Sequence, residues 1–293
     1  MKIVVIGSTG FIGNNIFKSL DKAKEHDLIG ISRNEVDLSR KNSHIALSKY
    51  LTDECLVIMC AGVKKQLGDN LEIFEKNLNI INNFCRAISM SPPQKIIFFS
   101  SASVYGEDVA YSEKISEKTP ILPGTYYGIA KYTSERLLEK TCTESDIGLA
   151  ILRPPLIYGN NDGSLGYGPT GFTYNAINEE EIILWGDGTE YREFVYVEDV
   201  SKIISLLIHS SHNGVINLVS GISYNFQQII DSLAKILNAN IKVKECKRTK
   251  AKVNHYYSNK TLKHLVDNFE FTSLNNGLKE MCKSLVNLRD EKN

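Results

Sequence analysis

The chain lacks long apolar runs, an excess of charge of either sign and any paired cysteine motif. No apolar run approaches the roughly 20 residues that span a bilayer, so we expect no membrane segment, and the first residues do not resemble a secretory signal. The 34 basic and 34 acidic residues balance, which gives no support for nucleic acid or an anionic membrane as a partner. The six cysteines include no CxxC pair, which favours reduced thiols and a cytoplasmic location.

The histidines also lack the spacing of metal ligands. They are scattered singly along the chain, and none pairs with cysteine or with another histidine at the short intervals that zinc sites use. The six are His26, His44, His209, His212, His255 and His264. We therefore expect no metal site.

Short apolar runs alternate with amphipathic stretches through the first half of the chain. The runs are residues 3–6, 28–31, 56–59, 96–99 and 149–152, with helical patterns such as 71–90 and 125–141 between them. Repeated strand–helix–strand units predict a parallel sheet, because parallel strands need crossover connections. We predict an α/β fold with a Rossmann-type doubly wound parallel sheet and a smaller C-terminal α/β substrate cap.

The pattern is less regular after Tyr158. Residues 159–171 are rich in Gly and Asn and predict a loop or lid. We expect a helix at 172–177, a strand at 182–184, a helix at 198–209 and a strand at 215–218. From Tyr224 onward we expect helix, strand and two helices. The dinucleotide-binding domain should comprise 1–157 together with 192–220, and the cap should comprise 158–191 and 221–293.

The first predicted strand leads directly into the sequence GSTGFIG, with glycines at 7, 10 and 13. Such glycines permit a tight turn and a close approach of the backbone to a pyrophosphate. The helix that begins there offers unpaired amides and the positive end of its dipole. A glycine pattern between a strand and a helix indicates dinucleotide binding.

The second predicted strand ends at Ser32 and Arg33, where an NAD site usually has an acidic residue. The planar guanidinium of Arg33 suits a 2′-phosphate, and Ser32 adds a hydroxyl. This favours NADP(H), with NAD(H) as the alternative. In that alternative Arg33 is a solvated loop residue, and Glu35 or Asp37 serves the ribose.

Two further segments carry groups for proton transfer. Tyr127 and Lys131 are four residues apart, which places them on one face of a predicted helix. A nearby ammonium favours the phenolate, so we expect Tyr127 to exchange protons near neutral pH. A serine from the strand end at 99–106 would hydrogen-bond a substrate oxygen.

These motifs together resemble the extended short-chain dehydrogenases/reductases that act on nucleotide sugars, over nearly the whole chain. GSTGFIG is similar to the GxxGxxG of that family, and Tyr127 and Lys131 match its YxxxK. RPPLIYG at 153–159 resembles its RPxxxYGP, although Asn160 replaces the final proline. The resemblance implies that Ser101, four residues before the tyrosine of VYG, is the catalytic serine.

The resemblance also assigns residues to two ligands. WGDGTEYREFVYVEDV at 185–200 is similar to a family stretch whose arginine, here Arg192, contacts the substrate diphosphate. It implies that residues 154–156 pass near the nicotinamide and that Asn77 braces the sheet. The expected cofactor residues are Gly7, Gly10, Phe11, Ile12, Gly13, Ser32, Arg33, Cys60, Ala61, Gly62, Tyr127, Lys131 and Pro154. The expected substrate residues are Ser101, Ala102, Ser103 and Arg192.

Positions at which the chain departs from the family pattern reduce the number of reactions that it is expected to catalyse. Sugar-nucleotide 4,6-dehydratases carry Asp-Glu where this chain has Ala102 and Ser103, so dehydration is disfavoured. GDP-fucose synthase has a cysteine at Ser103 and a histidine in the following loop, whereas residues 160–171 contain none. Leu156 replaces an asparagine of many UDP-galactose 4-epimerases. RPPLIYG resembles more closely the 4-ketoreductases of deoxysugar biosynthesis.

Three functions remain open from the sequence. The first is NADP(H)-dependent reduction of a nucleotide-linked 4-keto (deoxy)sugar, which Arg33 favours. The second is a nucleotide-sugar 4-epimerase with retained NAD. The third, a non-catalytic dinucleotide sensor, is disfavoured by the presence of Tyr127 and Lys131. The family resemblance and spare apolar positions on helices 71–90 and 125–141 imply a homodimer through a four-helix interface.

Overall fold

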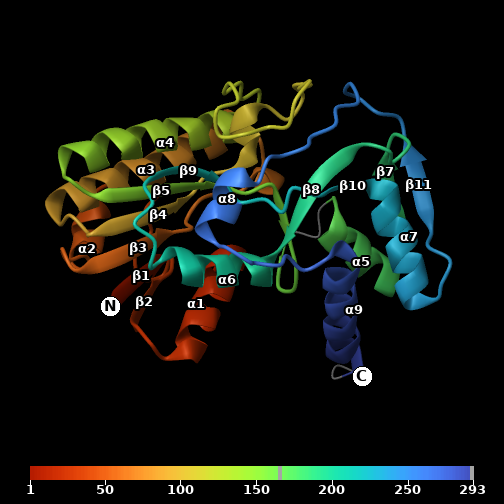
Figure 1. Ribbon diagram of the computed structural model, residues 1–293, viewed down its shortest axis with the longest axis horizontal. Coiled ribbons are helices and arrows are strands. Elements are labelled where there is room, and N and C mark those ends of the chain that lie inside the picture. The colour runs from red at the N-terminus through yellow and green to blue at the C-terminus, as the bar shows by residue number, and fades with distance from the viewer. Residues whose placement is uncertain (164–166, 291–293) are drawn as a thin grey trace.

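A parallel sheet forms the centre of the computed structural model, which describes residues 1–163 and 167–290 (Figure 1). Within those residues, its strand order is β2-β1-β3-β4-β5-β9. The strands are β1 (Lys2–Ile6), β2 (Asp27–Ile31), β3 (Cys55–Met59), β4 (Lys95–Phe99), β5 (Gly148–Arg153) and β9 (Gly214–Asn217). The order reverses between β1 and β3, and ligands bind at the carboxyl ends of strands beside such a reversal.

Helices cover both faces of this sheet (Figure 1). α1 (Phe11–Ala23) packs against α6 (Val197–Leu207) on one face, where Ile16 and Val200 are fully buried. α2 (His44–Ser48), α3 (Leu71–Met90) and α4 (Tyr126–Glu144) lie on the other face, with Phe84 and Leu138 in the core. The central strands β1, β3, β4 and β5 are buried on both sides, as in other doubly wound sheets, and the edge strands β2 and β9 are partly exposed.

A second hydrophobic cluster lies beside the sheet, at the right of Figure 1. It is built from α5 (Pro169–Ile177), β7 (Ile182–Trp185), α7 (Phe226–Leu237) and α9 (Leu274–Asp290). The exposed strand β11 (Val243–Cys246) pairs with β7 at its edge. Phe172, Leu184, Ile229 and Leu278 contribute buried side chains to it. α8 (Lys260–Leu265) instead returns to the main sheet, where Leu262 joins the α1–α6 side of the core.

The predicted fold class is confirmed, and each strand expected in the first half is present within a residue of its predicted bounds. A small sheet was not predicted: β8 (Tyr191–Tyr196) pairs with β6 (Leu156–Tyr158) and β10 (Ser223–Asn225). β6 and β10 are too short to show a period in the sequence. The loop was predicted to extend to residue 171, but α5 already begins at Pro169. Residues 164–166 of the predicted loop lie outside the described part of the chain.

Candidate active site

The glycine turn between β1 and α1 adopts a conformation that requires glycine. Gly7 has a φ of +84°, and a Cβ on it would lie 2.9 Å from the main-chain nitrogen of Ala61. A Cβ on Gly13 would lie 2.2 Å from the carbonyl oxygen of Gly7, so α1 packs directly on the turn. The Gly7 amide donates a 2.7 Å hydrogen bond to the carbonyl of Ile31 in β2. The turn therefore lies at the carboxyl ends of β1, β2 and β3.

The N-terminus of α1 has the features of an anion site. Gly10 is its N-cap, and no side chain of the described residues caps the helix. Phe11, Ile12 and Gly13 supply first-turn amides, which have no partner inside a helix and carry its positive dipole end. This bare, uncapped helix start fits the pyrophosphate of a dinucleotide.

Arg33 lines a groove just beyond β2, together with Glu35, Asp37, Arg40 and Lys41. Both nearby carboxylates already have partners. Glu35 accepts a 2.7 Å hydrogen bond from the buried Ser32 amide. Asp37 forms a 3.3 Å ion pair with Arg40. The groove therefore presents Arg33 beside two other cations, and its two acids are engaged by the loop itself.

Ser101, Tyr127 and Lys131 come together at the carboxyl end of β4. Ser101 caps the short helix η2 (Ala102–Tyr105), and α4 carries both of the others. The Ser101 hydroxyl lies beside the Tyr127 phenol and lowers its pKa. The Lys131 ammonium lies 5.9 Å from the centre of the Tyr127 ring. The predicted trio is thus one cluster in space.

The pKa values in this cluster differ from the expectation for Tyr127. Burial raises the pKa of Tyr127 to about 12. The Ser101 hydroxyl opposes this shift and the Glu107 charge adds to it. Burial lowers the pKa of Lys131 to about 8. The expectation that Lys131 brings the pKa of Tyr127 near neutrality is not met in the protein alone, because burial is the largest influence on that pKa.

The loop after β3 lies against Lys131. A Cβ on Gly62 would lie 3.5 Å from the Lys131 ammonium, and that charge partly offsets the burial that raises the pKa of Cys60 to about 12. Asn77 on α3 holds this loop with two hydrogen bonds to the main chain of Val63, at 2.8 and 3.0 Å. The amide is therefore placed to brace the loop beside the cluster.

Two residues expected near the ligands bind each other across the strand ends. The amide of Ala102 donates a 2.8 Å hydrogen bond to the carbonyl of Pro154, just after β5. Ala102 is itself buried. Pro154 consequently lies beside the start of η2, next to Ser101.

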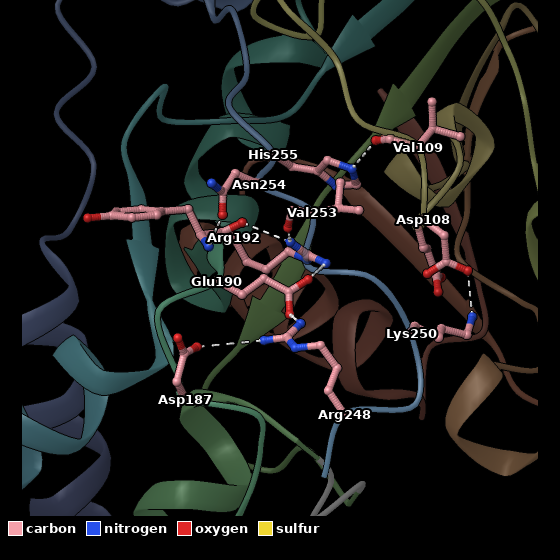
Figure 2. A network of polar contacts seen from close by, with 12 residues as sticks. Asp108, Val109, Asp187, Glu190, Arg192, Arg248, Lys250, Val253, Asn254 and His255 are labelled. Carbon is pink, nitrogen blue, oxygen red and sulfur yellow. Dashed lines mark hydrogen bonds and ion pairs between the residues drawn. The ribbon is translucent and has the colours of Figure 1, made fainter.

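A second polar cluster surrounds Arg192 on β8 (Figure 2). Arg192 donates hydrogen bonds to the main-chain carbonyls of Tyr191 and Val253. The Glu190 carboxylate pairs with Arg192 through one oxygen and with Arg248 through the other. The sequence did not predict Glu190 or Arg248, because Arg248 lies in a segment without regular periodicity.

The segment that follows Arg248 connects this cluster to the loop after η2 (Figure 2). Lys250 forms a 2.5 Å ion pair with Asp108. The His255 ring lies 3.0 Å from the carbonyl oxygen of Val109. Arg192 and Arg248, the arginine pair, therefore border the same loop as the cluster of Ser101, Tyr127 and Lys131.

Within residues 1–163 and 167–290, no group of three or more His, Cys, Asp or Glu side chains is arranged to hold a metal ion. In the same residues no helix is long and apolar enough to cross a membrane.

Comparison with known proteins gives a family match. The model of the NAD dependent epimerase/dehydratase family matches residues 3–219. GDP-6-deoxy-D-talose 4-dehydrogenase of Aggregatibacter actinomycetemcomitans is 25% identical over 296 residues, which cover 97% of this chain and 98% of that protein. UDP-glucose 4-epimerase of Lactobacillus helveticus is 26% identical over 277 residues, covering 82% of this chain and 83% of that protein.

Solved structures agree with the fold. UDP-glucuronic acid 4-epimerase from Bacillus cereus, in complex with UDP-glucuronic acid and NAD, superposes with a TM-score of 0.87 at 22% identity, covering 98% of this chain and 100% of that chain. UDP-glucose 4-epimerase from Thermotoga maritima, with UDP-glucose, gives a TM-score of 0.85 at 22% identity, covering 99% and 100%. At this level of identity the likeness establishes the fold alone.

Proposed function

Because the chain belongs to the NAD-dependent epimerase/dehydratase family, we propose that it interconverts an alcohol and a ketone at C4 of a nucleotide-linked sugar, with 4-epimerisation as the net reaction. The observation that carries the proposal is the meeting of Ser101, Tyr127 and Lys131 at the end of β4. The relatives favour this reaction over the NADP(H)-dependent reductase that the sequence favoured, since epimerases predominate among the named ones.

Three residues of the chain have separate roles at the reacting carbon. When bound over the glycine turn, the dinucleotide supplies a ring that accepts a hydride and returns it. Tyr127 takes the proton of the sugar hydroxyl and gives it back. Ser101 holds the same oxygen by a hydrogen bond. Lys131, anchored on the Phe99 carbonyl, orients the ribose and offers positive charge to the phenolate.

The arginine pair is our candidate for the other end of the substrate. The guanidinium groups of Arg192 and Arg248 converge on the Glu190 carboxylate. Two guanidinium groups in this arrangement suit a diphosphate, which presents oxygens to both. We propose that residues 1–157 and 192–220 form the dinucleotide-binding domain and that residues 158–191 and 221–293 form the substrate-binding cap, with Arg192 contributed to the substrate site from the first domain.

A second candidate is a 4-dehydrogenase or 4-ketoreductase that uses NADP(H). Two observations favour it. A relative that aligns over nearly the whole chain is a 4-dehydrogenase. The groove at Arg33 also contains Arg40 and Lys41, which suit a 2′-phosphate.

The two candidates differ in their use of the dinucleotide. An epimerase converts a UDP-linked hexose into its 4-epimer with no net formation of NADH, whereas a reductase consumes one NADPH for each 4-keto sugar. Product analysis by NMR, with dinucleotide absorbance followed in parallel, separates them. Tyr127→Phe should abolish either reaction and the exposed neighbour variant Tyr126→Phe should retain it. Full turnover by Tyr127→Phe contradicts the proposed chemistry.

We also propose a homodimer through α3 and α4, which pack side by side. Their exposed apolar side chains include Leu71, Met90, Tyr126 and Ile129. Burying such a face against a second copy is favourable. Sedimentation at micromolar concentration tests this, and a monomer there contradicts it.

A further inference from the structure

A row of hydroxyl groups leads from Tyr127 to a carboxylate on the loop after η2. The Ser101 hydroxyl lies beside the Tyr127 phenol and lowers its pKa. Ser101 donates to the Ser103 hydroxyl at 3.2 Å. Ser103 donates in turn to Glu107 Oε1 at 2.9 Å. The Ser103 amide fixes the spacing by donating to Ser101 Oγ at 3.1 Å. Ser103 Oγ therefore accepts from Ser101 and donates to Glu107.

The carboxylate at the end of this row reaches solvent. The Glu107 side chain is 30% exposed, and its second oxygen pairs with Lys65, whose side chain is 33% exposed. The titratable groups whose charge interacts with Glu107 come from three segments: Lys65 in η1 (Lys65–Leu67), Tyr127 in α4, and Lys250, His255 and Tyr257 in the stretch before α8. Glu107 therefore connects a half-buried phenol with water at the surface.

We propose that Ser103 and Glu107 form a proton path between Tyr127 and bulk water, as positioning residues for the acid–base step. The inference rests on the proposed function only in that Tyr127 is the group that exchanges a proton with the substrate.

Tyr127 needs such a path because the half-buried phenol holds its proton near neutral pH. It must lose that proton before it can accept one from a C4 hydroxyl. Tyr127 passes a proton to Ser101, Ser101 passes its own to Ser103, and Ser103 passes its own to Glu107, so each O–H bond that breaks is matched by one that forms. Oxidation of the sugar then removes one hydride to the dinucleotide and one proton to Tyr127, which balances atoms and electrons.

The first test follows the oxidation half-reaction in a single turnover, as reduced dinucleotide formed after mixing the protein with NAD and a UDP-linked hexose. Ser103→Ala breaks the row, and Ser103→Thr keeps a hydroxyl there as the matched control. We expect Ser103→Ala to slow the step by on the order of tenfold to a hundredfold. Added formate should restore the rate as a substitute proton carrier.

The second test needs no substrate. In NMR titrations of the protein with isotope-labelled tyrosine, Tyr127→Phe identifies the Tyr127 signal. Glu107→Gln should lower the pH at which Tyr127 ionises by about half a unit or more, because a negative charge beside the phenol is removed. Glu113→Gln, an exposed carboxylate on the same loop, should leave it unchanged.

Each outcome decides one claim. The proton path is contradicted if Glu107→Gln leaves the Tyr127 titration unchanged, or if Ser103→Ala reacts as fast as the parent. It is also contradicted if Ser103→Thr is as slow as Ser103→Ala and formate restores neither. If no nucleotide sugar reduces the dinucleotide in the parent protein, the proposed function fails, and the titration still decides whether Glu107 is coupled to Tyr127.

Discussion

The Lys131 ammonium donates a 2.7 Å hydrogen bond to the main-chain carbonyl of Phe99 at the end of β4. This contact holds the cation at the strand end, beside the Tyr127 ring. Burial at this position lowers the pKa of Lys131 from 10.5 to about 8. The folded protein therefore keeps a partly desolvated charge where the chemistry needs it, at a cost in stability.

Lys131→Met tests that cost through its pH dependence. Between pH 8 and 10.5 the unfolded chain keeps a proton on Lys131 that the folded protein has released, so the parent gains stability as pH rises through this window. Lys131→Met lacks this group, so its melting temperature relative to the parent should fall by a few degrees across the window. A difference that is constant with pH contradicts the lowered pKa, and Lys140→Met, an exposed lysine on the same helix, is the control.

Arg33→Ala tests the choice of dinucleotide. A guanidinium that contacts a 2′-phosphate contributes only to NADP(H), so the variant should bind NADPH about tenfold or more weakly. Its affinity for NADH should stay within about twofold. Calorimetric titration with both dinucleotides measures this, with the exposed Lys22→Ala on α1 as control. An equal loss of affinity for NADPH and NADH would instead indicate that Arg33 contacts the adenosine part that both dinucleotides share.

Glu190→Gln tests whether that carboxylate competes with the substrate diphosphate for Arg192 and Arg248. Removing its charge frees both guanidinium groups, so UDP should bind about threefold to tenfold more tightly. Asp187→Asn is the matched control, because the Asp187 carboxylate is 63% exposed and lies 3.9 Å from Arg248. Calorimetry with UDP gives the answer. Weaker binding by Glu190→Gln would mean that Glu190 positions the arginines instead.

The sequence predicted those parts of the site whose residues all lie within one short segment of the chain. The glycine turn could be predicted because Gly7 and Gly13 lie within one short segment and any side chain there would clash with the main chain. Tyr127 and Lys131 are readable because helical spacing places them on one face.

The parts that it did not predict depend on contacts between distant segments. Glu190 meets Arg248 across 58 positions, and Lys65 meets Glu107 across 42. No local period brings these residues together. The direction of the Tyr127 pKa shift was also missed, because burial is a property of the whole fold and the spacing of Tyr127 and Lys131 does not reveal it.

Glu193, next to Arg192 on β8, should make stability depend on pH near neutrality. Its side chain belongs to a residue only 1% exposed. Oε1 accepts hydrogen bonds from Ser220 and Gly221, while Oε2 has no hydrogen-bond partner among the described residues. Burial raises the pKa of Glu193 from 4.5 to about 7 in spite of those hydrogen bonds.

A raised carboxyl pKa means that the folded protein keeps a proton that the unfolded chain releases, so this contribution to stability is full below pH 4.5 and is lost as pH rises through about 7. Glu193→Gln cannot titrate. Its free energy of unfolding should therefore improve relative to the parent between about pH 5 and pH 8, by at most about 3 kcal/mol. Urea unfolding across that range measures the difference, with the exposed Glu180→Gln as control. A constant difference would mean that Glu193 is already ionised in the folded protein at pH 5, and that its hydrogen bonds to Ser220 and Gly221 outweigh its burial.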